Sequence, residues 1–194
     1  MVGAARIERN LERHDQLGII SSNPEQLAVR GATIIDDQPD TGKPDPQDRH
    51  TSGQLLAQTP SGINYVAGRI HQRANASGIN QSVVLFRFEN DSHQPSVRAE
   101  LMGDGFDRAT AIAITPNGDV IIAGHTTSSD FPGFTLDNAV FAKHNSKLFV
   151  ARYSPELELL SSSTLSGEGH ILAQDLLIDP DGLVYITGST NAKD

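Results

Sequence analysis

Acidic and hydroxyl side chains cluster in the segments GDGFD, HTTSSD and GEGH, which begin at residues 103, 125 and 167. Carboxylate oxygens are preferred ligands of calcium, and carboxylate and hydroxyl groups also hydrogen-bond to polar partners such as sugars. A calcium-binding or carbohydrate-binding face is therefore one hypothesis for these segments. The candidate ligand-binding residues are Asp104, His125, Ser128, Ser129, Asp130 and Glu168.

The same residues also have a structural interpretation. Asp130 precedes Phe131 and Pro132, and it can cap a turn while Phe131 packs between two repeats. The glycines that flank Asp104 and Glu168 can relieve crowding where repeats meet. Both interpretations stay open on the sequence alone.

The other sequence signals for chemistry are negative. The chain has no cysteine, which excludes disulfides and thiolate chemistry. Its seven histidines include no His-x-x-x-His pair, so no metal site is predicted. It also has no Gly-x-Ser-x-Gly, phosphate-loop or dinucleotide motif. We therefore assign no catalytic residue, no metal ligand and no cofactor, apart from the calcium of the hypothesis above.

The charge balance limits the classes of partner. The formal net charge is −9, from 15 Lys and Arg against 24 Asp and Glu. Nucleic acid and anionic membrane surfaces are poor partners for such a chain, because both are bound by clustered basic side chains. No apolar run reaches the ~18–20 residues of a membrane-spanning helix, so no membrane insertion is expected. Charges between Arg6 and Asp15 interrupt the apolar stretch that a signal peptide needs, so no export signal is predicted.

An internal repeat indicates how the chain is organised. The segment ITPNGDVIIAG at residues 114–124 recurs as IDPDGLVYITG at residues 178–188, and a weaker copy, QTPSGINYVAG, spans residues 58–68. Proline presets its φ near −65° and glycine accepts positive φ, so the shared Pro-x-Gly predicts a tight hairpin turn in each copy. The predicted turn residues are Pro60, Gly62, Pro116, Gly118, Pro180 and Gly182.

Each repeat is predicted to contain four short strands. In the middle copy they cover residues 110–115, 119–124, 148–153 and about 159–165. Antiparallel order then places the second-to-third loop and the links between repeats on the same edge, which brings the candidate binding segments together. Arg87 and Arg152 both end third strands, where an ion pair with a neighbouring carboxylate is expected. The predicted core residues are Ile112, Ile114, Val120, Ile122, Leu176, Ile178, Val184 and Ile186.

The repeats resemble the bacterial SBBP-type beta-propeller repeat family, which is named for a seven-bladed propeller. The resemblance rests on AIAITPNGDVIIAGHTTSSDFP, on KLFVARYSPELELLSSSTLSGEG and on LLIDPDGLVYITGST. It covers the chain well from about residue 101 onwards and loosely from about 51 to 100, where the first copy lacks the Ser-Asp-Phe-Pro run. It implies an all-β fold, a partial β-propeller of four-stranded antiparallel blades, with about two full blades, half of a third, and an irregular N-terminal segment.

The expected domain organisation follows from these boundaries. Residues 1–50 are expected to form an N-terminal segment with a weak helix or strand signal and a Pro/Asp-rich linker. Residues 51–194 are expected to form the repeats, as approximate blades 51–107 and 108–171 and an incomplete blade 172–194. Because an open row of blades exposes apolar faces and strand edges, the chain is expected to be a fragment of a longer protein or to self-associate into a closed ring.

The resemblance implies a non-enzymatic binding or scaffold module in a larger bacterial surface or secreted protein. It thereby also suggests an extracellular or cell-surface location, although no signal peptide is predicted from the sequence. The alternatives are a propeller enzyme of the lyase or lactonase type and the carbohydrate- or calcium-binding face. Expected partners are protein or carbohydrate, together with further blades or further copies of the chain.

Overall fold

The computed structural model describes residues 17–22, 29–35, 50–74, 78–90, 92, 94–133 and 145–192. These residues form β-strands, turns and loops, and there is no helix among them. The strands make two four-stranded sheets and two strand pairs, all antiparallel. The all-β prediction is therefore confirmed for the described part of the chain. None of the described segments forms a helix that would span a bilayer.

The middle sheet contains the four strands predicted for the middle repeat. They are β7 (Asp107–Ile114), β8 (Val120–Thr126), β9 (Lys147–Tyr153) and β10 (Leu159–Leu165). The spatial order is β10-β9-β8-β7, so every strand pairs with its neighbour in sequence. The largest difference from the prediction is that β7 begins at Asp107 rather than at Thr110.

The first sheet has the same order of strands. It contains β3 (His50–Gln58), β4 (Asn64–Ala74), β5 (Gly78–Phe88) and β6 (Val97–Leu101). Each strand again pairs with its neighbour in sequence. The two four-stranded sheets therefore have one topology, although the first copy of the repeat is the weaker match in sequence.

Two strand pairs complete the described structure. β11 (Ile171–Ile178) pairs with β12 (Val184–Thr190) in the third repeat. β1 (Leu17–Ser22) pairs with β2 (Val29–Ile35) near the N-terminus. β2 contains most of the strand signal found in residues 1–50, whereas the weak helix signal after Ser22 and the Pro/Asp-rich linker fall on residues outside the described ones.

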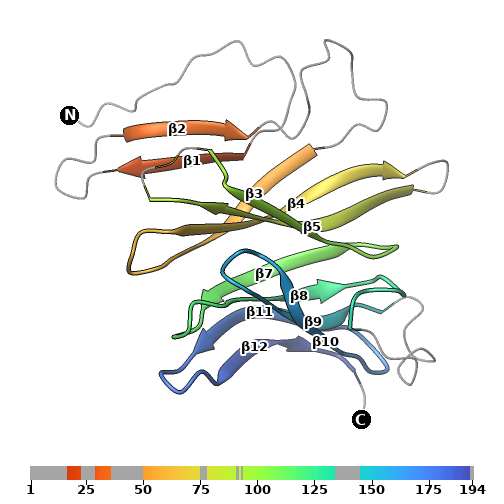
Figure 1. The fold of residues 1–194 in the computed structure, drawn as a ribbon. Helices are drawn as coiled ribbons and strands as arrows, with labels where there is room; N and C mark the ends of the chain where they lie inside the picture. The colour runs from red at the N-terminus through yellow and green to blue at the C-terminus, as the bar shows by residue number, and fades with distance from the viewer. Residues whose placement is uncertain are drawn as a thin grey trace, which may run out of the picture.

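The sheets stack along the chain, with the first strands of successive repeats in contact (Figure 1). β7 contacts β3, β4 and β5 of the first sheet, and β11 contacts β7, β8 and β9 of the middle sheet. Each repeat therefore packs on the one before it. The contacts made by β7 with both β3 and β11 place the first strands of the three repeats next to one another.

The three Pro-x-Gly turns share one hydrogen-bond pattern. In each turn the glycine N–H donates to the carbonyl three residues earlier, over 2.9–3.0 Å. Gly62, Gly118 and Gly182 have φ values of +91°, +92° and +85°. Only glycine adopts this left-handed conformation without a steric cost, and this explains why the glycine recurs in every copy.

A β-bulge recurs at one position in the first strand of each repeat. The register shifts at matching points in β3, β7 and β11, and a glycine lies opposite the residue that precedes each bulge: Gly68, Gly124 and Gly188. A Cβ on Gly124 would lie 2.0 Å from the backbone oxygen of Arg108, and one on Gly188 would lie 2.0 Å from that of Leu172. The final glycine of the repeated segment is therefore set by the close approach of two strands.

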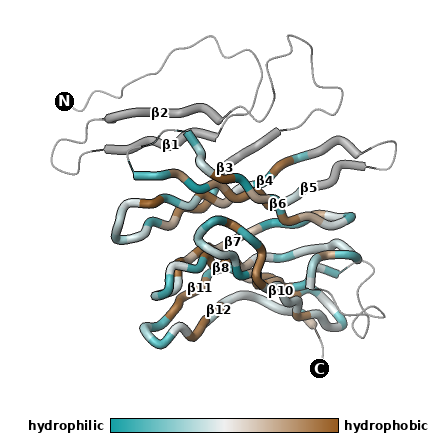
Figure 2. The backbone as a smooth tube through the Cα atoms, viewed as in Figure 1, coloured by the Kyte–Doolittle hydropathy of each residue, from teal (hydrophilic) through white to brown (hydrophobic). Residues whose placement is uncertain are grey.

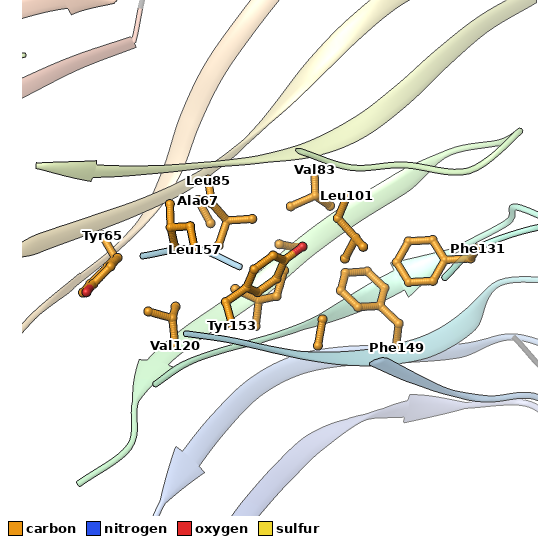
Figure 3. Close-up of a cluster of buried hydrophobic side chains, with 13 residues drawn as sticks. Tyr65, Ala67, Val83, Leu85, Leu101, Val120, Phe131, Phe149, Tyr153 and Leu157 are labelled. Atoms are coloured by element: carbon orange, nitrogen blue, oxygen red, sulfur yellow. The ribbon is translucent and has the colours of Figure 1, made fainter. Parts of the chain in front are cut away.

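The main core lies between the first and middle sheets (Figure 3). Apolar segments follow the strands of these sheets, and polar residues are common in their turns (Figure 2). The rings of Phe131 and Phe149 meet with their centroids 4.8 Å apart. The buried members of this cluster are Tyr65, Ala67, Val83, Leu85, Leu101, Ala109, Val120, Ile122, Phe131, Phe149, Ala151, Tyr153 and Leu157.

The predicted core residues fall into two groups. Val120 and Ile122 are fully buried, and Ile112 and Ile114 pack against the main core while partly buried. In the third repeat Leu176, Ile178 and Ile186 are only partly buried, and the prediction was wrong for Val184, which is 37% exposed. The reason is that β11 pairs with β12 alone among the described strands, so this repeat has less sheet around it to bury side chains.

Candidate functional site

The link at residues 102–106 and the loop that follows β8 lie side by side at one edge of the middle sheet. The Phe106 N–H donates to Thr127 Oγ1 over 2.9 Å, and the Thr127 N–H donates back to the Phe106 carbonyl over 2.9 Å. His170 and Asn191 make the matching bonds in the third repeat, over 2.6 and 3.1 Å. Loop and link therefore meet in a fixed register, as the antiparallel strand order predicts.

Asp104, Ser129 and Asp130 form the exposed half of this meeting point. The Asp104 carboxylate accepts bonds from the Ser129 N–H at 2.6 Å and the Ser129 hydroxyl at 2.5 Å. Asp130 Oδ1 accepts the Asp104 N–H at 2.7 Å. The bond from the Ser129 hydroxyl lowers the pKa of Asp104 below its ordinary value, so this side chain is a carboxylate at neutral pH.

Asp107 forms the buried half. Its Oδ1 accepts the hydroxyls of Thr126 at 2.5 Å and Ser128 at 2.7 Å, and its Oδ2 accepts the Gly103 N–H at 2.7 Å. The residue is fully buried, and this burial raises the pKa of Asp107. Three donors therefore converge on one carboxylate, which fastens the link to the loop.

Lys147 adds a buried cation beside these carboxylates. Its Nζ donates to the Ser128 carbonyl at 2.5 Å, and the residue is almost completely buried. Burial lowers the pKa of Lys147, whereas the nearby charges of Asp104, Asp107 and Asp130 oppose that shift. The site thus contains one buried cation among three acidic side chains.

The predicted site residues are only partly brought together. Asp104, Ser128, Ser129 and Asp130 share the network described above, with Ser128 Oγ also accepting the Gly105 N–H at 2.8 Å. His125 lies on β8 opposite Arg108, where burial lowers its pKa, and its Nδ1 has no hydrogen-bond partner within the described part of the chain. Glu168 lies exposed in the link between the middle and third repeats. Among the described residues, neither of these two joins the network.

Asp107, Thr126 and Lys147 are network members outside the six candidate ligand-binding residues, although Asp107 was expected on the same surface. Asp107 lies in the repeat alignment opposite Ile171, so the signal for it was a carboxylate in a column where another copy has an apolar residue. Ser128 corresponds in the same way to Ala192. The third repeat therefore lacks the counterparts of Asp107 and Ser128, although the backbone contacts around them recur there.

The geometry favours the structural interpretation of these side chains. The carboxylates accept hydrogen bonds from neighbouring backbone and hydroxyl groups, and the described residues contain no group of three or more His, Cys, Asp and Glu that could hold a metal ion. A Cβ on Gly103 would lie 2.4 Å from Ser128 Cβ, and one on Gly105 would lie 2.8 Å from Thr127 Oγ1. These glycines allow the link to approach the loop closely.

Replacing Asp107 with asparagine is expected to destabilise the protein by about 1–3 kcal/mol. An amide has only one oxygen, so its NH2 group would face either the Gly103 N–H or the two hydroxyls. The measurement is the free energy of unfolding from urea titration. Asp130→Asn is the control, because a single amide oxygen can keep the bond that Asp130 Oδ1 accepts from the Asp104 N–H. Equal losses in the two variants would contradict the role given to Asp107.

At the opposite edge, Arg87 and Arg152 pair with carboxylates, as predicted. Arg152 Nε donates to Asp119 Oδ2 at 2.7 Å. Arg87 lies 3.2 Å from Glu89 Oε1 and 3.8 Å from Glu156 Oε1, which belongs to the next repeat. These arginines therefore support the turns and the contact between repeats.

No known family model matches the chain, and no curated protein matches it either.

Proposed function

We propose that this chain is a non-enzymatic module of SBBP-type propeller repeats, a binding or scaffold part of a larger bacterial surface or secreted protein. The observation that carries the proposal is the recurrence of three backbone features at matching positions of the repeats. The Pro-x-Gly turn and the bulge opposite a glycine occur in all three repeats, and the paired bonds between link and loop occur in the middle and third repeats. Such regularity is typical of tandem structural units.

The stacking of the repeats supports the propeller hypothesis. Propeller blades are four-stranded antiparallel sheets arranged around an axis. Both complete sheets have this composition and order, and the first strands β3, β7 and β11 contact one another in chain order. In a propeller the first strand of each blade lies next to the axis, so the first strands of neighbouring blades contact one another. The contacts of β7 with β3 and with β11 fit this arrangement.

We propose that partners bind at the edge of the middle sheet where the link at residues 102–106 meets the loop that follows β8. Met102 and Phe106 are half exposed on the same link that carries Asp104, and Ser129 and Asp130 are exposed beside them. We call these five residues the binding edge. Apolar and aromatic side chains surrounded by a few polar groups are suited to protein or carbohydrate partners. A non-enzymatic role fits the internal hydrogen bonding of the carboxylates, and turnover of a lactone or of a uronate polymer by the purified chain would contradict it.

The calcium-binding alternative has a specific observation in its favour, namely that Asp104 and Asp130 are both exposed on the binding edge. Under the scaffold proposal, we expect millimolar calcium chloride to leave the melting temperature unchanged. Calcium that binds the folded state would instead raise it by mass action. The measurement is thermal unfolding of the wild type, of Asp130→Ala, and of Asp181→Ala as an exposed carboxylate at the opposite edge. A calcium-induced rise that only Asp130→Ala abolishes would replace the scaffold proposal with a calcium-binding face.

A further inference from the structure

Two apolar residues of the binding edge, Met102 and Phe106, are not required by the fold of their link. In the repeat alignment they correspond to Ser166 and His170. The link of the third repeat still makes the matching pair of bonds with its loop, through the N–H and the carbonyl of His170. Met102 is nevertheless 48% exposed and Phe106 is 51% exposed. The middle link therefore presents two large apolar side chains that the backbone geometry does not explain.

The backbone beneath these side chains is held in place. The Gly103 N–H donates to the buried carboxylate of Asp107 over 2.7 Å. Phe106 exchanges two backbone bonds of 2.9 Å with Thr127 of the loop. A partner that binds here therefore has little backbone to order, and a preorganised surface loses less conformational entropy on binding.

The exposed charge beside the two apolar side chains is negative. Asp104 lies between them in the chain, and its N–H donates to Asp130 Oδ1 at 2.7 Å, which makes the two exposed carboxylates neighbours. The hydrogen bond from the Ser129 hydroxyl lowers the pKa of Asp104, so its charge persists at neutral pH. The nearby cation of Lys147 is almost completely buried. A partner that complements this surface must therefore bring a positive charge together with an apolar contact.

From these observations we propose that the binding edge takes up an arginine side chain of a protein partner. A guanidinium is a planar cation, so it can lie on the Phe106 ring while its N–H groups donate to a carboxylate. Asp104 and Asp130 keep acceptor sites for it, because an ionised carboxylate can accept about four hydrogen bonds. The methylene stem of arginine suits contact with Met102. The inference rests on the proposed function, since it names the partner of the surface proposed there.

Two other occupants fit the surface less well. The ammonium of lysine is a compact, strongly hydrated charge without a planar face, so it gains less from an aromatic ring and from paired acceptors. A sugar ring can stack on Phe106, but it carries no charge to complement Asp104 and Asp130. Both occupants are included as outcomes of the experiment.

The probe is the tripeptide Gly-Arg-Gly with blocked termini, titrated to millimolar concentration into the isotope-labelled 194-residue protein. We expect saturable changes in the NMR shifts of the amides of residues 103–106. The amides of residues 167–170 are the internal control, because the third link has polar residues in place of Met102 and Phe106. A tripeptide with citrulline in place of arginine is expected to cause little change, because citrulline keeps the shape of arginine without its charge.

Variants of the binding edge locate the arginine. Phe106→Ala and Asp130→Asn are each expected to weaken tripeptide binding about two- to fivefold, the effect of one exposed cation–ring contact or one exposed ion pair. Both variants can keep the backbone bonds that hold the link. Glu168→Gln is the matched control, because it removes an exposed carboxylate from the third link and is expected to leave binding unchanged. Circular dichroism establishes that the variants remain folded.

Four results would overturn the inference. They are no saturable change at residues 103–106, equal changes with the citrulline tripeptide, equal binding of a lysine tripeptide, and unchanged binding by both binding-edge variants. Saturable changes with the neutral sugar maltotriose, without a response to the arginine tripeptide, would show that a carbohydrate occupies the edge instead. The turnover and calcium assays involve no arginine, so this inference can fail while the proposed module function stands.

Discussion

Replacing Phe149 with alanine is expected to lower the free energy of unfolding by about 3–5 kcal/mol. The side chain is fully buried in the main core, and its ring packs on Phe131 with the centroids 4.8 Å apart. Removing the ring leaves a cavity at the contact between the first and middle sheets, where the strands on both sides are paired and can collapse only partly. Urea unfolding followed by circular dichroism measures the loss.

Phe106→Ala is the matched control for this prediction. Phe106 is about half exposed on the link before β7, and its hydrogen bonds to the loop are made by the backbone. The control is therefore expected to cost well under half of the loss in Phe149→Ala. If the two variants lost equal stability, the interface between the sheets would not be the main core of the protein.

Replacing Gly124 with alanine is expected to destabilise the protein by about 3 kcal/mol. The new Cβ would lie 2.0 Å from the Arg108 backbone oxygen and 2.8 Å from both Ala109 Cα and Phe149 Cε1. Two of these three atoms belong to the backbone of β7, so the contact can be relieved only by separating β7 from β8 at the bulge. The measurement is again the free energy of unfolding.

Gly118→Ala separates steric overlap from backbone strain. Gly118 has a φ of +92°, but the nearest atom to a Cβ there is Pro155 Cγ at 3.7 Å, which is ordinary contact. The variant carries only the cost of a left-handed alanine, about 1–2 kcal/mol. A loss in Gly118→Ala as large as that in Gly124→Ala would show that the bulge accommodates a side chain.

The middle sheet could be predicted closely because its signals are local. Pro116 and Gly118 specify the turn between β7 and β8 through their own φ preferences. The β-branched residues on either side then fix the strands. The recurrence of the same segment from residue 178 strengthened this prediction, because a chance pattern does not recur in one chain with the same turn residues. For each strand and turn of this sheet, the residue propensities and the repeated sequence pattern led to the same prediction.

Features that depend on tertiary contacts were not predicted. The burial of Asp107 and Lys147 results from the loop and link closing over them, which no local pattern records. Leu157 occupies the glycine position of a turn with the same hydrogen bonds, at a φ of +61°. Burial of its side chain in the main core offsets a backbone strain that sequence rules would assign to glycine.

The pairing of neighbouring strands in chain order also determines how the module responds to mechanical force. Ile171 and Thr190 are directly paired at the open end of the β11–β12 hairpin, so tension between them acts across the ladder. The hydrogen bonds then break one pair after another, as in unzipping, instead of resisting together in shear. Tension applied between these two residues would therefore open the β11–β12 pair in small steps, one residue pair at a time.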